Sequence, residues 1–259
     1  MNPDRIIAIV NQKGGVGKTT TSINLAASLA QKGLRVLLID MDPQGNASTG
    51  LGIPRAQRGQ TIYNVLTEDL SIDDAIVPTE VDNFSILPSH VDLAAAELEI
   101  GQVEGRTRIL RDAISKAESK FDYVMIDCPP SLNLLTINAL SAARSVIVPL
   151  QCEFFALEGL SQLLQTVEMA KSSINPALVI DGVMLTMYDR RNRLSAQVAE
   201  DVRKHLGRAV FNTIIPRNVR IAEAPSFGQA VIDYAPNSKG AKAYLELADE
   251  LIKKHRNRN

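Results

Sequence analysis

A glycine-rich segment near the start of the chain carries lysines and threonines at a spacing suited to phosphate binding. It follows an apolar run at 6–10 and precedes a helical pattern. The glycines let backbone N–H groups turn inward, and the helix that follows adds its positive end. We expect Lys18 to reach the β- and γ-phosphates and the Thr19 hydroxyl to coordinate Mg²⁺. The candidate nucleotide-binding residues are therefore Lys13, Gly14, Gly15, Val16, Gly17, Lys18, Thr19 and Thr20.

The loop departs from the standard pattern G-x-x-x-x-G-K-[ST], because Gln12 stands in place of the first glycine. Two ammonium groups five residues apart cannot both approach the same phosphates without repelling each other. We therefore expect Lys13 to point outward, toward the nucleotide of a second molecule. The form K-G-G-x-G-K-T resembles the deviant Walker A motif of the ATPases that include ParA/Soj partition proteins, MinD-type ATPases and nitrogenase iron protein. In that class the early lysine crosses a dimer interface, so the resemblance implies a homodimer formed with ATP.

Three aspartates follow two apolar runs that are expected to be strands. Asp40 and Asp42 come after the run at 36–39, and Asp127 ends the run at 123–126. Ligands of α/β proteins bind at the carboxyl ends of the strands, and residues two apart in an extended chain share a face. An aspartate at such a place is commonly a turn or cap residue. All three beside a GKT loop favour a magnesium site, with Asp127 in the Walker B position.

Two longer blocks, at 40–52 (DMDPQGNASTGLG) and 127–135 (DCPPSLNLL), closely resemble the ParA/Soj family. The resemblance implies that Asp42 orients the attacking water and that Asp40 and Asp127 serve the Mg²⁺ shell together with Thr19. It makes the segment after Asp127 a nucleotide-sensing switch. The cofactors are then ATP and Mg²⁺, and the catalytic candidates are Lys13, Lys18 and Asp42. Phosphoryl transfer needs positioning and charge neutralisation, not a covalent nucleophile.

A third block, IPRNVRIAEAPSFG at 215–228, follows a late apolar run. By itself it indicates a strand, a turn and the start of a helix, with Asn218 as a possible N-cap. It also resembles the partition ATPases, in which the proline and asparagine contact adenine, so the resemblance gives Pro216 and Asn218 that role. The similarity extends over essentially the whole chain.

The small net charge hides two strongly charged segments. The whole chain has 28 Lys and Arg against 29 Asp and Glu, a net charge of −1. Residues 68–104 carry ten acidic side chains and no Lys or Arg, whereas residues 190–220 carry eight basic and two acidic ones, a net charge of +6. Both could be ordinary solvated faces. A basic cluster without exposed aromatic partners also favours contact with nucleic-acid phosphates over base stacking.

The resemblance implies which partners these charged segments meet. Arginines at the positions of Arg191 and Arg220 contact double-stranded DNA without sequence specificity, and Arg190 and Arg193 are neighbouring candidates. A ParB-type centromere-binding protein would stimulate hydrolysis. The acidic segment, with Glu97 and Glu99, could receive a basic peptide of that partner. Because only 12 residues precede Lys13, an N-terminal helix-turn-helix and operator-specific repression are not expected.

Apolar runs alternate with amphipathic helical patterns along the chain, which is typical of an α/β protein with a sheet covered on both faces. The sequence predicts one P-loop ATPase domain over residues 1–259, with a single doubly wound, mainly parallel sheet flanked by helices. The expected strands are 6–10, 36–39, 84–87, 123–126, 146–148, 178–186 and 210–215. The expected helical faces include Ile23/Ala26/Ala27/Ala30 and Val198/Ala199/Val202/Leu206.

Three other functions remain open. A MinD-like membrane-cycling ATPase needs an amphipathic tail, but the stripe Tyr244/Leu247/Ala248/Leu251/Ile252 is expected to dock on the core, and residues 253–259 have no apolar side chain. An iron–sulfur reductase needs two cysteines per chain, which Cys128 and Cys152 match in number only. A metabolic P-loop ligase would need a substrate-binding insertion, and none is visible. Without a signal peptide, membrane span or disulfide framework, we expect a cytoplasmic, nucleoid-associated protein with no membrane partner.

Overall fold

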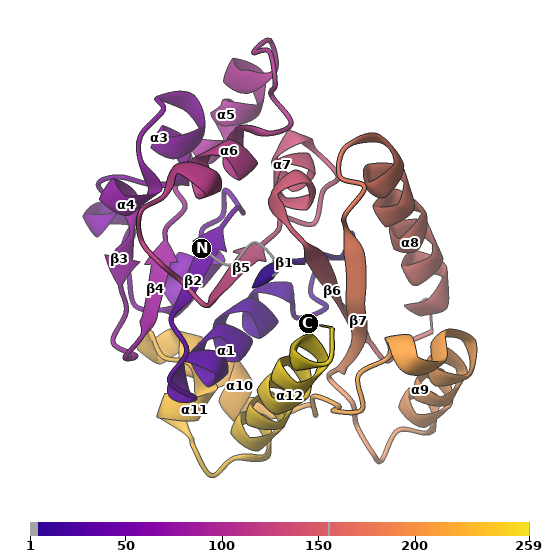
Figure 1. Cartoon of the computed structure of the whole chain (residues 1–259). Helices are drawn as coiled ribbons and strands as arrows, with labels where there is room; N and C mark the ends of the chain where they lie inside the picture. The colour runs from indigo at the N-terminus through magenta and orange to yellow at the C-terminus, as the bar shows by residue number, and fades with distance from the viewer. Residues whose placement is uncertain (1–4, 155, 259) are drawn as a thin grey trace.

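A seven-stranded sheet forms the centre of the molecule (Figure 1). The structure is a computed structural model, and it describes residues 5–154 and 156–258. The strand order is β3-β4-β2-β5-β1-β6-β7. All neighbours are parallel except β3, which pairs antiparallel with β4. The strands are β1 (Ile6–Ile9), β2 (Val36–Asp40), β3 (Val77–Pro78), β4 (Phe84–Leu87), β5 (Tyr123–Asp127), β6 (Ser145–Gln151) and β7 (Val179–Thr186).

Helices cover both faces of the sheet, so most strand residues are buried on both sides. Alternate residues divide between two apolar cores: Ile7 and Ile9 join one, and Ala8 and Val10 join the other. Helices α1 and α12 lie side by side over the first face (Figure 1). The helices are α1 (Lys18–Gln31), α2 (Asn46–Gly50), α3 (Ile62–Thr67), α4 (Ile72–Ala75), α5 (Leu93–Ile100), α6 (Ile109–Lys116), α7 (Leu134–Ala142), α8 (Ala156–Ser173), α9 (Arg193–Leu206), α10 (Val219–Glu223), α11 (Val231–Tyr234) and α12 (Lys239–Arg256).

The doubly wound, mainly parallel α/β fold is confirmed, and six of the predicted strands form. The chain order reverses at β1, which lies between β5 and β6, so the crevice for a ligand opens at the carboxyl end of β1. The predicted helical faces are buried in α1 and α9, except that Leu206 is partly exposed.

The strand predicted at 210–215 is wrong. This segment runs beside β7 but forms no ladder with it: Val210 makes one isolated bridge with Val183, and the Ile215 N–H donates to the Leu185 carbonyl at 2.9 Å. The backbone N–H groups of Asn212 and Thr213 turn away and donate to the Glu250 carboxylate on α12, at 2.7 and 2.9 Å. A side chain therefore satisfies donors that a ladder would need. The two-residue strand β3 escaped prediction because it is too short to show a pattern.

The end of α12 is fixed to the sheet by a buried carboxylate. Asp181 lies near the amino end of β7 and is fully buried. Its carboxylate accepts hydrogen bonds from Ser145 and Arg258 and contacts His255 Nε2 at 2.9 Å, and the Tyr123 hydroxyl lies 3.2 Å from His255 Nδ1. Burial opposes its ionisation, but the His255, Ser145 and Arg258 contacts outweigh burial and lower the pKa of Asp181. The predicted stripe on α12 is indeed docked, since Tyr244, Leu247 and Leu251 are buried.

Candidate active site at the carboxyl edge of the sheet

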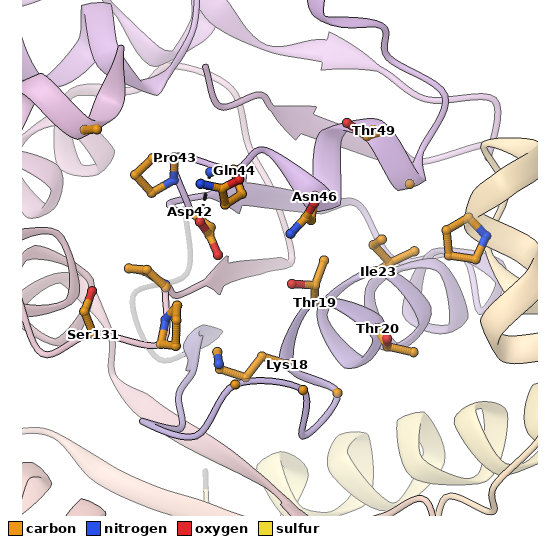
Figure 2. A pocket seen from close by; sticks show the side chains of 18 of the residues that line it. Lys18, Thr19, Thr20, Ile23, Asp42, Pro43, Gln44, Asn46, Thr49 and Ser131 are labelled. Carbon is orange, nitrogen blue, oxygen red and sulfur yellow. Dashed lines mark hydrogen bonds between the residues drawn. The ribbon is translucent and has the colours of Figure 1, made fainter. Parts of the chain in front are cut away.

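A cleft of about 850 Å³ opens where the glycine-rich loop meets the segments after β2 and β5. Figure 2 shows Lys18 and Thr19 on one side of this cleft and Asp42 and Asn46 on the other. The structure thus brings the predicted phosphate loop and Asp42 to one site. The wall also includes Gly14, Gly15, Gly17, Thr20, Gln44, Thr49, Glu97, Pro129, Ser131 and Met187.

The glycine-rich loop is open toward the cleft. Gly15 and Gly17 have φ values of +76° and +91°, which side-chain-bearing residues rarely adopt. A Cβ added at Gly14 or Gly15 would meet no atom within 4 Å, so the space beside their backbone is free for phosphate oxygens. α1 begins at Lys18 immediately after the loop and directs its N–H groups there.

Lys18 and Lys13 lie in different surroundings. Lys18 is 7% exposed, and its Nζ donates to the Lys13 carbonyl at 3.2 Å. Burial lowers the pKa of Lys18, while Asp127 and Asp42 act in the opposite direction. The Lys13 side chain is 46% exposed and forms an ion pair with Glu153, which follows β6. The two ammonium groups are therefore directed to separate partners.

Asp40 and Asp127 form a buried acidic pair. They are register partners on the adjacent strands β2 and β5, and both are fully buried. Asp40 accepts hydrogen bonds from the Ser48 N–H and hydroxyl at 2.9 and 2.7 Å. Asp127 Oδ1 accepts one from Ser22 at 2.7 Å, but its buried Oδ2 has no partner among the described residues. Burial raises the pKa of Asp40 to about 6, and burial together with the Asp40 charge raises that of Asp127 to about 7.

This donor set fits a magnesium ion. One Asp127 oxygen is orphaned, and the Thr19 side chain lies near enough to that carboxylate to lower its pKa. Carboxylate and hydroxyl oxygens are the ligands that Mg²⁺ prefers. Within the described residues no group of three or more His, Cys, Asp or Glu side chains could hold a metal by itself. That is the usual situation for Mg²⁺, which takes few protein ligands and completes its shell with water and nucleotide phosphates.

Asp42 stands at the start of a tight turn beside this pair. Its Oδ1 accepts a hydrogen bond from the Gln44 N–H at 2.9 Å, and its carbonyl accepts one from the Gly45 N–H at 2.8 Å. Figure 2 shows the carboxylate facing the cleft opposite Lys18. The turn, rather than a helix or strand, therefore fixes the direction of this side chain.

A second, smaller cavity of about 220 Å³ adjoins the loop at Gly17 and Thr20. Pro216 and Asn218 line it, together with Met187, Ile215, Ile221 and Tyr244. Asn218 is the N-cap of α10, since its Oδ1 accepts from the Arg220 N–H at 2.9 Å. The cavity is mainly apolar, as small-molecule sites commonly are.

The predicted basic residues lie on two adjacent segments. Arg190, Arg191 and Arg193 are exposed around the turn between β7 and α9, and Arg220 is exposed on α10. The two segments meet where the Arg217 N–H donates to the Tyr188 carbonyl at 3.0 Å. Arg191 pairs with Asp189 at 3.0 Å and Arg220 with Glu223 at 2.8 Å. Exposed pairs of this kind are weak, so phosphate oxygens could replace the carboxylates.

Sequence reasoning missed four residues that shape the site. Ser22 and Ser48 hold the two buried aspartates, Glu153 holds Lys13, and Arg58 supports the Asp42 turn. Ser22 lies one helical turn after Lys18, so its spacing could have suggested it. Ser48 lies only eight residues after Asp40, but it reaches that carboxylate from a separate helix. Arg58 and Glu153 act through contacts between segments far apart in the sequence, which no local pattern reveals.

The chain is similar to known proteins over nearly its whole length. Residues 4–180 match the family model described as an AAA domain. The chain is 57% identical to the chromosome partitioning protein ParA of Caulobacter vibrioides, covering 99% of this chain and 97% of that one. It is 53% identical to the sporulation initiation inhibitor protein Soj of Bacillus subtilis, covering 95% and 98%. The chain belongs to the ParA/Soj family of chromosome partitioning proteins. Members of this family are ATPases, and so is this chain.

A solved structure has the ParA/Soj fold seen here. It is described as cobyrinic acid a,c-diamide synthase from Mycobacterium smegmatis with bound ADP and magnesium, and it superposes with a TM-score of 0.86 at 39% identity, covering 98% of this chain and 96% of that one. Cys128 and Cys152, the two candidates for an iron–sulfur cluster, are both buried in the apolar core. Both cysteine side chains therefore pack in the core of this protein, and burial raises the pKa of both thiols.

Proposed function

We propose that this single-domain ATPase works as a partition switch: ATP closes a homodimer that binds DNA without sequence specificity, and hydrolysis releases it. The arrangement of Lys18 and Asp42 around one cleft, with Lys13 directed away from it to Glu153, carries the proposal. Lys18 would hold the bound triphosphate, whereas Lys13 would leave Glu153 and reach the nucleotide of the partner subunit. Asp42 would orient the attacking water, and Asp40, Asp127 and Thr19 would hold Mg²⁺, which neutralises phosphate charge when bound.

The apolar cavity beside the loop supports a role in base binding. Pro216 and Asn218 line it, and it meets the phosphate cleft at Gly17. A nucleotide with its phosphates at the loop could therefore place adenine there. Because Asn218 uses its Oδ1 to cap α10, its amide nitrogen remains the group that would contact the base.

The exposed arginines support the DNA-binding step. Arg190, Arg191, Arg193 and Arg220 lie on adjoining segments, and pairing two subunits would double the number of phosphate contacts. Each contact that releases a counterion makes affinity steeply salt-dependent. If ATP strengthens DNA binding by closing the dimer, DNA must strengthen ATP binding and dimer formation by the same factor, because the coupling is reciprocal. The complex would act at the nucleoid.

A basic peptide of a ParB-type protein would bind the acidic surface formed by residues 68–104. Helix α5 lies within this surface, and Glu97 there lines the nucleotide cleft and accepts a hydrogen bond from the Leu135 N–H at 3.4 Å. A cation at Glu97 would thus act next to the segment that follows Asp127. Charge-neutral variants of Glu97 and Glu99 should lose stimulation by the partner.

The test is binding of random-sequence duplex DNA at several salt concentrations with ATP, ADP or no nucleotide. Wild type should bind tightly only with ATP. Lys13→Ala should bind weakly in all three states, Asp42→Ala should remain on DNA with ATP, and Arg191→Ala/Arg220→Ala should bind weakly with a smaller salt slope. Arg111→Ala, on α6, is the matched control and should behave as wild type. Equal wild-type affinity in all three nucleotide states would overturn the proposal.

The MinD-like alternative has a separate readout. None of the described helices is long and apolar enough to span a bilayer, and the apolar stripe of α12 is already buried. Co-sedimentation with anionic liposomes in the presence of ATP should therefore recover no more protein than without ATP. ATP-dependent recovery with the liposomes would favour the membrane function instead.

A further inference from the structure

Arg58 is a buried cation that contacts no carboxylate among the described residues. It follows the short 3-10 helix Arg55–Gln57 and is only 7% exposed. Its Nε and Nη2 donate to the Ile53 carbonyl at 3.1 and 2.8 Å, and its Nη1 donates to the Ser89 carbonyl at 3.0 Å. Burial lowers the pKa of Arg58, whereas the Asp40 charge acts against that shift. Burying a guanidinium costs folding free energy that its hydrogen bonds only partly offset, so its position calls for an explanation.

The guanidinium reaches the turn that begins at Asp42. Nη2 donates to the Thr49 hydroxyl at 2.8 Å and lies 3.4 Å from the Gly45 carbonyl. Gly45 ends the Asp42 turn and precedes α2, and its φ of +62° suits glycine. A Cβ at Gly45 would lie 2.4 Å from Arg58 Nη1 and 3.3 Å from the Ser89 carbonyl oxygen. The backbone of the turn is therefore packed directly on the guanidinium.

A chain of hydrogen bonds holds α2 from its other side. Ser48, on α2, donates to Asp40, and the Ser89 N–H donates to the Ser48 hydroxyl at 3.0 Å. Ser89 follows β4, and its carbonyl accepts from Arg58. The segment from Asp42 to Thr49 is thus tied to β2 through Asp40 and to β4 and the 53–58 loop through Arg58.

We propose that Arg58 is a positioning residue for ATP hydrolysis: it fixes the Asp42 turn so that the carboxylate is held toward the attacking water. This inference rests on the proposed role of Asp42. Arg58 contacts no residue of the 13–20 loop in its hydrogen bonds. Loss of the guanidinium should therefore slow the chemical step without weakening nucleotide binding, because it is positioning rather than phosphate contact that is lost.

Steady-state kinetics on four variants test the proposal. Arg58→Met should lower kcat at least about tenfold and leave KM for ATP within about twofold. Arg58→Lys keeps the charge, but a single ammonium cannot span Ser89, Ile53 and Thr49 together, so it should fall between wild type and Arg58→Met. The matched controls are Arg55→Met and Arg55→Lys. Arg55 is exposed and touches the same turn only at the Gln44 carbonyl, 3.4 Å away, so both should keep wild-type kcat.

Two outcomes would overturn the proposal: an unchanged kcat in a folded Arg58→Met protein, or a KM that rises in step with the loss of kcat. If Arg58→Met does not fold, Arg58→Lys decides by the same criteria, with its thermal midpoint measured alongside. In single-turnover assays, Arg58→Lys should lower the rate of ATP hydrolysis when it is introduced into wild type. It should lower the rate little further when it is introduced into Asp42→Ala, because both changes act through the Asp42 carboxylate. An additive loss contradicts the inference. Failure of wild type to bind DNA with ATP would reject the partition switch alone and leave these kinetics as the test of Arg58.

Discussion

Two fully buried carboxylates, Asp127 and Asp181, lie at opposite ends of the same mainly parallel sheet. Their hydrogen-bond partners differ, and their pKa values are shifted in opposite directions. Asp181, near the amino end of β7, has Ser145, His255 and Arg258 as partners, and these contacts lower its pKa. Asp127, at the carboxyl end of β5, has an oxygen without a partner, and its burial together with the charge of the neighbouring Asp40 raises its pKa.

The difference separates a structural group from a group that awaits a ligand. Buried polar atoms in folded proteins are almost always hydrogen-bonded, so an orphaned carboxylate oxygen requires an explanation. Strongly perturbed acids that lie at a cleft are candidates for functional sites. At Asp181 the fold supplies its own cations. At Asp127 the missing positive charge would be Mg²⁺, which arrives with the nucleotide.

The largest effect is expected from breaking the amino-end network. Asp181→Asn leaves Arg258 without its counter-charge and weakens the contact with His255. Breaking a buried ion pair costs about 3–5 kcal/mol, and the lower end of that range applies because the Arg258 side chain is 40% exposed. Urea unfolding at pH 7 should show this loss in the free energy of unfolding. Since the folded-state pKa of Asp181 is lowered, its stabilising contribution is present at neutral pH and is lost as the pH falls below about 4. A loss below about 1 kcal/mol would mean that the network is not structural.

The next effect concerns turnover. Asp127→Asn should reduce ATP hydrolysis at least about 100-fold, equivalent to about 2.7 kcal/mol, because a neutral amide is a poor Mg²⁺ ligand. Asp181→Asn, assayed at a temperature where it is folded, should stay within about threefold of wild type. Comparable losses in both variants would erase the distinction between the two ends of the sheet.

Replacing Asp127 should change the free energy of unfolding in the opposite direction to replacing Asp181. Without metal and nucleotide, Asp127→Asn should be more stable than wild type at pH 8 by about 1 kcal/mol or more. Folding raises the pKa of Asp127 from about 4 to about 7. Between these values only the folded protein holds the proton, so wild-type stability falls as the pH rises through this window. Unfolding in EDTA from pH 5 to 8 should show the gap widening. A gap that stays constant with pH would contradict the assigned cause.

The smallest effect tests the edge of the Asp181 network. Tyr123→Phe removes the hydroxyl 3.2 Å from His255 Nδ1 and should cost about 1 kcal/mol of unfolding free energy. ATP hydrolysis should not change. A change in turnover larger than about twofold would indicate that the two ends of the sheet communicate.

The sequence predicted the nucleotide end of the sheet much better than the opposite end. Lys18, Asp42 and Asp127 lie in short, ordered motifs, where strand, loop and helix are consecutive and their side chains must meet at one edge. The direct partners of the Asp181 carboxylate lie up to 113 positions apart, from Ser145 to Arg258, and nothing near any one of them indicates the others.

The strand expected at 210–215 does not form for the same reason that the roles of Arg58 and Glu153 were not predicted. Apolar β-branched residues there have the local character of a strand, but Glu250 on α12 takes the N–H groups of Asn212 and Thr213. Arg58 and Glu153 likewise gain their roles from distant segments. Tertiary partners therefore decided what local propensity could not.

The most direct test is the rise in thermal midpoint that Mg²⁺ and ATP together produce in wild type, Asp127→Asn and Asp181→Asn. A ligand stabilises the folded state in proportion to its binding. If Asp127 awaits the metal-bound nucleotide, wild type and Asp181→Asn should gain equally, while Asp127→Asn should gain much less, although it starts higher. An equal gain in all three proteins would contradict the account.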